Sequence, residues 1–294
     1  MLQCLQLEAI NYPKSVTFCN ISVIFIEMKQ LFARLALVLS SPLLCDSVVG
    51  QNSTGLTFLD KSKYLSLPEA SPSYRGVNVP VHDLSGNFPL PGNQGQQGSC
   101  VGWAVSYGLK SFQEQVERKW TIDSADKVFS PSFVFNMIKF PGAEAGANFE
   151  VALNFLQEVG TVPLSEFPYS DQDFTTKPTN DLIVRGAKYR IQSWSRVSPE
   201  FIGEIKGHLL NNYPVLVGCR VGWEFSDHLS GANKSKPFVQ KFHDPDLSGH
   251  AMVVVGFNDN RNAFKLLNSW GREKGDNGYV WVNYQTFSRI TREA

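Results

Sequence analysis

Three segments of this chain hold residue types that together can activate a thiol nucleophile, and the first of them contains Cys100. Cys100 follows the glycine-rich sequence NQGQQGS and begins a segment with helical periodicity, in which Val105, Leu109, Phe112 and Val116 share one face. A thiol at the start of a helix lies near unpaired backbone N–H groups and the positive end of the dipole, which favour the nucleophilic thiolate. The alternative is that Cys100 is a buried small apolar residue, as most free cysteines are.

The other two segments favour the chemical role. His250 stands directly before the apolar run AMVVVGF, which is typical of a buried strand, and Asn268 stands at the end of another strand-like run. Cysteine, histidine and asparagine in this order can supply a nucleophile, its base and a group that orients the base. Gln94, shortly before the cysteine, adds a side-chain amide that can point to the same place, although it can also be a simple turn residue.

These motifs resemble those of papain-family cysteine peptidases of the compact type that has no large prodomain. The matching pieces are NQGQQGSC, GHAMVVVGF and NSWG followed by GDNGY, and the resemblance covers roughly residues 80 to 290. The separations in sequence from Cys100 to His250 and from Cys100 to Asn268 lie at or just beyond the upper end of the roughly 130–150 residues typical of papain and cathepsin enzymes. The resemblance implies an α+β fold with two lobes, one helical and one an antiparallel β-barrel-like lobe, and an active-site cleft between them.

The resemblance also implies a role for individual residues. Cys100 would be the nucleophile, His250 its general base and later acid, and Asn268 the residue that holds the imidazole. The Gln94 amide and the Cys100 backbone N–H would form the oxyanion hole, and Trp270 would cover the hydrogen bond between His250 and Asn268. The implied activity is hydrolysis of peptide bonds in a peptide or protein substrate through an acyl-enzyme, without a cofactor or a metal.

The chain departs from the better-known members at three places. Val101 and Gly102 separate the nucleophile from the first tryptophan, Trp103, and Gln97 stands where those members have a disulfide-bonded cysteine. Their substrate-binding glycine pair is at best Ala145–Gly146 here, so Gly146 is the candidate for binding the substrate main chain. The chemistry is unaffected by these departures, whereas substrate recognition is expected to differ.

Two other function classes remain open at this point. One is a catalytically silent peptide-binding protein on a peptidase scaffold, because a fold does not guarantee its chemistry. The other is acyl transfer to an amine instead of water. His243, Asp244, Asp246 and His250 could suggest a metal site, but they lack regular ligand spacing, so we interpret them as part of a polar loop. His228 beside Asp227 is an alternative candidate for the catalytic base.

The composition describes an ordinary globular protein. The chain has 294 residues, of which 43% are hydrophobic and 18% charged, and its formal net charge is zero. This length allows one large domain or two small ones with an ample core. A formal net charge of zero gives no electrostatic reason to expect nucleic acid or an anionic membrane as a partner. We expect a monomer without an integral membrane span.

The first part of the chain has the order of a secretory signal. Residues 28–50 combine a positive start at Lys29 and Arg34 with an apolar stretch from Leu35 to Leu44 and small residues after it, which is too short to span a bilayer. We therefore predict an over-extended start at 1–27, a signal peptide at 28–50, a linker or short pro-segment at 51–80 and the peptidase domain at 81–294. The protein would be secreted or periplasmic; a lipid anchor at Cys45 and a membrane-anchoring helix are the alternatives.

Periodicity and capping residues predict the order of the elements. Of the five cysteines, Cys100 and Cys219 alone fall in the mature chain, so no disulfide is expected. Ser130 with Pro131, and Ser198 with Pro199, read as helix starts. The predicted elements are helices from Cys100, from Pro131, over 148–160 and near 198–212, followed by strands at 215–221, 251–257, 263–267 and 279–282.

Overall fold

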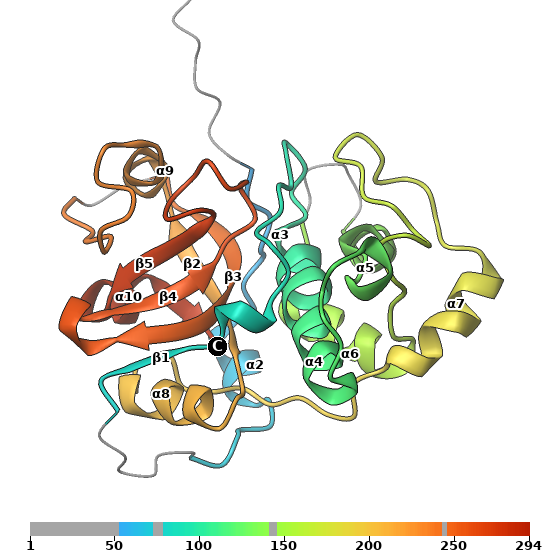
Figure 1. Cartoon of the computed structure of the whole chain (residues 1–294), viewed down its shortest axis with the longest axis horizontal. Helices are drawn as coiled ribbons and strands as arrows, with labels where there is room; N and C mark the ends of the chain where they lie inside the picture. The colour runs from blue at the N-terminus through green and yellow to red at the C-terminus, as the bar shows by residue number, and fades with distance from the viewer. Residues whose placement is uncertain (1–52, 73–78, 141–145, 243–245) are drawn as a thin grey trace, which may run out of the picture. The chain divides into compact units, whose positions relative to one another are not determined.

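The computed structural model of the protein describes residues 53–72, 79–140, 146–242 and 246–294 (Figure 1). They belong to one unit, residues 51–294, whereas residues 1–50, which include the predicted signal peptide and Cys45, lie outside the described residues. Within the described unit one group of helices gathers on one side, and the strands gather with the remaining helices on the other. The predicted α+β class with a helical lobe and an antiparallel strand lobe is confirmed.

Two helices of the helical lobe begin directly after the predicted residues Ser130 and Asn148. The Ser130 hydroxyl accepts a hydrogen bond from the Phe133 N–H at 3.1 Å, and the Asn148 side chain accepts one from the Val151 N–H at 2.9 Å. The helical path from Cys100 is continuous, because π-helical turns over Trp103–Lys110 join its first two helices. The helices are α3 (Cys100–Gly102), α4 (Ser111–Arg118), α5 (Pro131–Ile138), α6 (Phe149–Glu158) and α7 (Asn180–Gly186).

The strand lobe is one antiparallel sheet with the order β5-β4-β3-β2-β6, and β1 pairs with the end of β3. The sheet is open, so the barrel-like closure expected from the resemblance is not seen in the part of the chain that the structure describes. The four predicted strands are all present. The strands are β1 (Val81–Asp83), β2 (Val215–Val221), β3 (Ser248–Asn258), β4 (Ala263–Leu267), β5 (Tyr279–Asn283) and β6 (Thr291–Glu293).

Three further helices belong to the strand lobe: α8 (Ile202–Leu210), α9 (Trp223–Ser230) and α10 (Tyr284–Ile290). The predicted start of α8 at Ser198 is wrong. Residues Ser198–Phe201 instead make a turn, in which the Phe201 N–H approaches the Ser198 carbonyl at 3.4 Å, and α8 begins after it. A capping pair of residues can therefore begin a turn that the helix does not continue.

The helix that begins at Cys100 packs directly on β3. Val105 of the helix and Val253 of β3 are both fully buried in one shared apolar core. Complete burial of an aliphatic side chain of this size stabilises a fold by roughly 1.5–3 kcal/mol. This packing holds the start of the helix, and thus Cys100, against the strand that carries His250.

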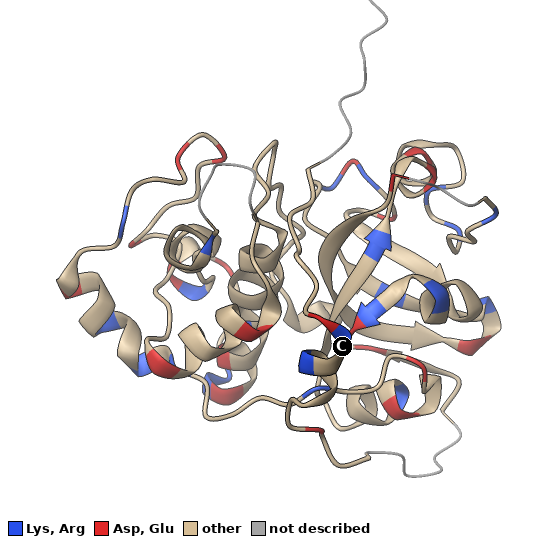
Figure 2. Ribbon diagram, turned by 180° about the vertical axis from the view of Figure 1, so that it is seen from behind, with Lys and Arg blue, Asp and Glu red and all other residues tan. Residues whose placement is uncertain are grey.

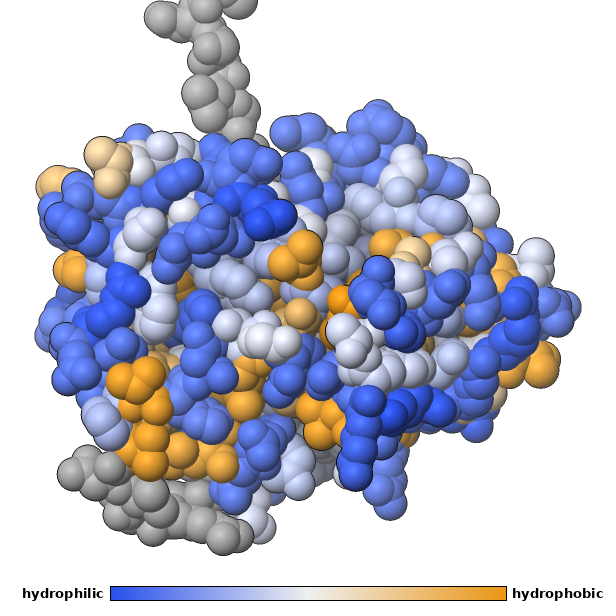
Figure 3. All heavy atoms as spheres, viewed as in Figure 1, coloured by the Kyte–Doolittle hydropathy of each residue, from blue (hydrophilic) through white to orange (hydrophobic). Residues whose placement is uncertain are grey.

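The surface has no single dominant charge. Figure 2 shows basic and acidic residues interspersed along the ribbon of both lobes, in agreement with the zero formal charge. On the face seen in Figure 3 the surface is mostly hydrophilic, and hydrophobic side chains gather in the lower half of the view. In the described residues we find no helix of the length and apolar character that a membrane crossing requires.

Candidate active site

His250 and Asn268 are joined by a short hydrogen bond in the strand lobe. His250 lies on β3, Asn268 directly follows β4, and the distance from His250 Nε2 to Asn268 Oδ1 is 2.7 Å. Because the amide oxygen also accepts the Ser269 N–H at 2.9 Å, it acts as an acceptor and assigns the imidazole hydrogen to Nε2. Nδ1 is then left as the basic nitrogen, and it has no hydrogen-bond partner among the described residues.

Cys100 begins the helical path of the other lobe. Its thiol is fully buried and lies beside the backbone of Ala251, the residue after His250, and beside the backbone of Leu56. The helix start is positioned by Ser99, whose hydroxyl is 2.7 Å from the hydroxyl of Tyr169. The structure thus brings the predicted nucleophile and the predicted base to the same border between the lobes.

Gln94 connects the glycine-rich loop before Cys100 to the segment after Asn268. Its backbone N–H donates to the Ser269 carbonyl at 2.8 Å, and its side-chain oxygen accepts the Ser269 hydroxyl at 2.6 Å. Its Nε2 donates one hydrogen to the Gln97 carbonyl at 2.8 Å. An amide NH₂ has two hydrogens, so the second is free to donate to an oxyanion near Cys100.

Trp270 packs on the imidazole ring. The centroids of the Trp270 and His250 rings are 4.5 Å apart and their planes are tilted by 30°. Trp270 is itself held from behind by Phe225, at 5.6 Å in an edge-on arrangement. The indole therefore lies against the imidazole that hydrogen-bonds to Asn268, which is where the resemblance would place a residue that covers this bond.

The border between the lobes, where the resemblance places the active-site cleft, is occupied by residues 53–72, which we call the strap. In Figure 1 the strap descends in blue between the two lobes and continues into α2 (Lys61–Leu65). The Leu56 N–H donates to the Gly249 carbonyl at 3.0 Å on the strand side. On the helical side the Ala147 N–H donates to the Gly55 carbonyl and the Thr57 N–H donates to the Ala147 carbonyl, both at 2.9 Å.

Gly55 and Leu56 hold the strap in the cleft through close backbone packing and a buried side chain. The backbone of Gly55, at φ 151°, lies so close to the glycine-rich loop that a Cβ atom at this position would be 2.0 Å from the Gly98 carbonyl oxygen. No side chain is therefore tolerated there without displacing the strap. Leu56 is only 5% exposed and its side chain lies against Gly218 and Phe149. The Trp270 indole N–H adds a hydrogen bond to the Ser53 carbonyl at 2.9 Å.

Under the strap Cys100 and His250 are both held in their neutral forms. Burial raises the pKa of the Cys100 thiol to about 12, although nearby backbone N–H groups oppose the shift. Burial also lowers the pKa of His250 to about 4, against the opposing effect of Asn268. Both shifts have the same cause, since a charged group loses its solvation in a covered site. The thiolate expected from the helix start is therefore disfavoured while the strap is in place.

The residue whose main chain binds the strap is Ala147, which follows the predicted residue Gly146. Gly146 has φ 60°, and a Cβ there would be 1.9 Å from the Gly55 carbonyl oxygen, but Gly146 makes no hydrogen bond to the strap among those described. Ala147 makes both of them. The pair that faces an extended chain is thus Gly146–Ala147, and Ala145 lies outside the described residues.

The competing candidates lie away from this site. His228 is on α9, where its Nε2 is 3.1 Å from the Lys236 carbonyl and its ring packs on Phe238. No group of metal-ligating side chains is found among the described residues, and His243 and Asp244 lie outside them. Cys219 is a free, fully buried cysteine on β2, 3.5 Å from the Thr291 hydroxyl.

Sequence reasoning missed several contributors to the site. Ser269 holds Gln94, and Tyr169 holds the loop before Cys100 by donating to the Gln94 carbonyl at 2.8 Å. Ser269 lies within the NSWG motif and could have been found there, whereas Tyr169 has no local signal. The strap residues Ser53–Phe58 have no catalytic chemistry in their side chains, so nothing in their sequence pointed to the cleft.

Comparison with known proteins agrees with this geometry. The family model for the papain family cysteine protease matches residues 87–294. Among curated proteins, a putative cathepsin L 3 of Paramecium tetraurelia is 27% identical over 236 residues, 74% of this chain and 66% of that protein. An uncharacterized peptidase C1-like protein of Acanthamoeba polyphaga mimivirus is 25% identical over 205 residues, 66% of this chain and 64% of that protein. The chain thus spans slightly less than two thirds of the length of these relatives.

Solved structures show the same fold. Xylellain, a cysteine protease from Xylella fastidiosa, superposes with a TM-score of 0.67 at 24% identity, covering 84% of this chain and 97% of that one. The bromelain protease from Ananas comosus superposes with a TM-score of 0.55 at 17% identity, covering 72% of this chain and 96% of that one. Because the family model covers well over half of the sequence, the chain belongs to the papain family of cysteine proteases.

Proposed function

We propose that the protein is a cysteine peptidase that hydrolyses peptide bonds through an acyl-enzyme formed on Cys100. The observation that carries the proposal is the His250–Asn268 hydrogen bond of 2.7 Å, packed under Trp270 at the border where the Cys100 helix begins. This arrangement assigns the imidazole hydrogen to Nε2 and leaves Nδ1 as the basic nitrogen that would accept the Cys100 proton.

The reaction begins with transfer of the Cys100 proton to His250 Nδ1. The thiolate attacks the scissile carbonyl carbon, and the C=O π electrons move to oxygen. The oxyanion accepts hydrogen bonds from the Cys100 backbone N–H and the free hydrogen of Gln94 Nε2; removal of such a donor costs about 3–4 kcal/mol of transition-state stabilisation. Collapse breaks the C–N bond while His250 gives its proton to the leaving amine. His250 then takes a proton from water, whose oxygen displaces the sulfur and releases the acid.

The covered cleft supports the view that this structure is a latent form. A substrate needs the main-chain groups of Gly249 and Ala147, and the strap uses both. The neutral thiol and neutral imidazole agree with latency, because the ion pair requires solvation that the strap excludes. Release of the strap would restore both the binding groups and the charged pair.

Product analysis tests the activity. The Gly55→Val variant, in which the strap cannot seat, is incubated with a peptide pool with and without an added primary amine, and the products are identified by mass spectrometry. We expect new peptides that end in a free carboxylate in both samples. Products that carry the added amine would instead establish acyl transfer, and peptides that are retained but uncut would establish a silent binding protein.

We further propose that the chain is exported with the signal peptide at 28–50, so that the strap becomes the N-terminus of the mature protein. The positive start, apolar stretch and small residues of this segment support the proposal. N-terminal sequencing of the exported protein should give a sequence that begins near Gln51. A mature protein that begins at Met1 would contradict it, and a lipid on Cys45 would establish the anchored alternative.

A further inference from the structure

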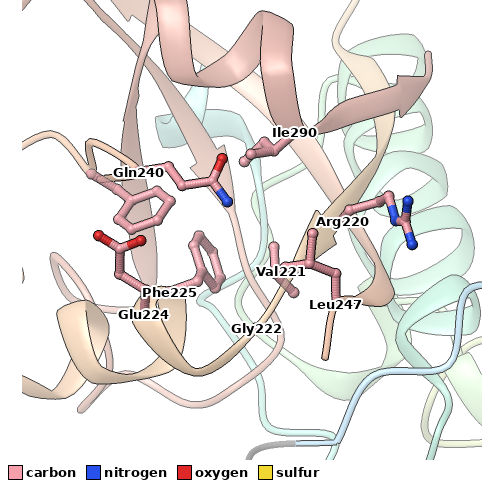
Figure 4. A pocket seen from close by; sticks show the side chains of 9 residues that line it. Arg220, Val221, Gly222, Glu224, Phe225, Gln240, Leu247 and Ile290 are labelled. Carbon is pink, nitrogen blue, oxygen red and sulfur yellow. The ribbon is translucent and has the colours of Figure 1, made fainter. Parts of the chain in front are cut away.

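A large cavity lies behind the strap, away from the catalytic groups. Its volume is about 610 Å³, within the range of roughly 300–1,000 Å³ that is usual for small-molecule sites. By contrast, the cavity beside β2 in Figure 4, lined by Phe225, Gln240 and Ile290, measures only about 10 Å³ and holds at most one water molecule. Size alone therefore singles out the larger one.

Three parts of the described chain form the walls of this cavity. The strap contributes Leu59, Tyr64 and Leu67, the helical lobe contributes residues of the Cys100 helix such as Phe112, and the strand lobe contributes Leu216 of β2. The lining is mostly aliphatic and aromatic, so a ligand with a substantial apolar part would be favoured.

Glu293 is the polar group that distinguishes the site. It lies on β6, lines the cavity and is only 4% exposed. Its Oε1 accepts the Leu59 N–H at 2.6 Å, and Oε2 has no hydrogen bond among the described residues. Burial raises the pKa of Glu293 to about 7, because its charged form has too little solvation.

Most of the other ionisable groups that line the cavity are paired or neutral. The Ala294 carbonyl oxygen, which also lines it, accepts the Val197 N–H at 2.9 Å. Glu150 is paired with Lys63 at 2.8 Å, and Arg196 is paired with Glu69 at 2.7 Å. Burial lowers the pKa of His208, which keeps it neutral near pH 7, and Glu117 accepts a hydrogen bond from Gln113 at 2.9 Å. Burial likewise raises the pKa of Tyr64, so its phenol also stays neutral. Glu293 thus has no cationic partner on the walls that the structure describes.

We propose that this cavity is a binding site for an apolar molecule that carries one protonated amine, with Glu293 as its counterion. The apolar walls take the hydrocarbon part, and the carboxylate oxygen that lacks a partner accepts the ammonium hydrogens. An anion would be repelled by the Glu293 carboxylate, and a neutral molecule would leave that carboxylate without a cationic partner.

Occupancy of the site also stabilises the latent form. One wall of the cavity belongs to the strap, so a ligand that touches all three walls binds the closed state better than the open one and shifts the equilibrium toward it. This second effect rests on the proposed function, whereas the binding itself does not. Binding measured directly therefore separates a failure of the cavity proposal from a failure of the peptidase proposal.

The test compares n-octylamine, n-octanol and n-octanoate by titration calorimetry with the full chain. At pH 8 we expect octylamine to bind at least about tenfold more tightly than octanol, with octanoate weakest. Between pH 8 and pH 6 the preference for octylamine should fall about tenfold, because a Glu293 with a pKa of about 7 must first lose its proton. Saturating octylamine should also slow alkylation of Cys100.

Two variants make the outcome decisive. Glu293→Gln keeps an acceptor for the Leu59 N–H and should make octylamine and octanol bind equally; Leu216→Trp fills the cavity from β2 and should remove binding of both. Equal or tighter binding of octanoate, an unchanged amine preference in Glu293→Gln, or the absence of binding by any probe would each overturn the proposal. The Glu293→Gln result stands by itself if Leu216→Trp does not fold.

Discussion

Gly55→Val is expected to uncover the active site and raise the rate at which iodoacetamide alkylates Cys100 at pH 7 by roughly a hundredfold or more. The reason is steric: the new Cβ would lie 2.0 Å from the Gly98 carbonyl oxygen, so the strap must leave the cleft. Solvent then reaches a thiol whose pKa is about 12 while it is covered. A thiol paired with an imidazolium has a pKa below neutrality.

The size of this effect follows from two opposing terms. At pH 7 the lowered pKa increases the thiolate fraction by about 10⁵, while the lower basicity reduces the intrinsic reactivity of each thiolate by about the square root of that factor. The pH profiles should differ as well. Labelling of the unaltered protein should rise through the whole alkaline range toward a pKa of about 12, whereas labelling of the variant should be constant from about pH 6 upward.

Gly86→Val is the matched control. A Cβ at Gly86 meets no atom within 4 Å, so this substitution adds the same side chain without touching the strap. In the Gly86→Val protein, iodoacetamide should alkylate Cys100 as slowly as it does in the unaltered protein. If Gly55→Val labels no faster than Gly86→Val, the strap is not what protects Cys100, and the latent state proposed above is wrong.

Cys100→Ala in the Gly55→Val background is expected to lower peptide hydrolysis by at least about 10⁴-fold, since no other group can form the acyl-enzyme. The fold should remain, because loss of one buried sulfur atom costs on the order of 1–2 kcal/mol. Initial rates on a fluorogenic peptide, together with the thermal midpoint, measure both quantities.

Cys219→Ala provides the comparison. Cys219 is equally buried and equally free, but it lies on β2 beside Thr291. It should lose a similar amount of stability and keep full activity. Turnover that survives in Cys100→Ala would place the nucleophile elsewhere, and a loss of activity in Cys219→Ala would show that buried cysteines matter here through packing.

Local chemistry explains why part of the fold could be predicted. The strands from β2 to β5 are mostly apolar. The helices α5 and α6 follow Ser130 and Asn148, whose side chains cap them. Such signals lie within a few residues of the structure that they specify. The nucleophile, base and amide positions were equally visible, because glycine-rich turns and apolar runs surround them.

The remainder depended on contacts between distant residues. The register that pairs Ala147, instead of the predicted Gly146, with Leu56 of the strap depends on a residue far away in sequence. α9 follows Gly222, which provides no side-chain cap, so α9 had no start signal. The raised pKa of Cys100 likewise results from a cover that no property of its own segment could reveal.

The hydrogen bonds between Gln94 and Ser269 have a mechanical consequence. Together with the bridge between Asn93 and Trp270, they tie the loop before the nucleophile to the loop after Asn268, so the two walls of the cleft are fastened at one end. Any opening of the lobes wide enough for a folded surface would displace Gln94, the proposed oxyanion donor. We therefore expect the proposed peptidase to accept a single extended chain, and to cut proteins that locally unfold more readily than rigid ones.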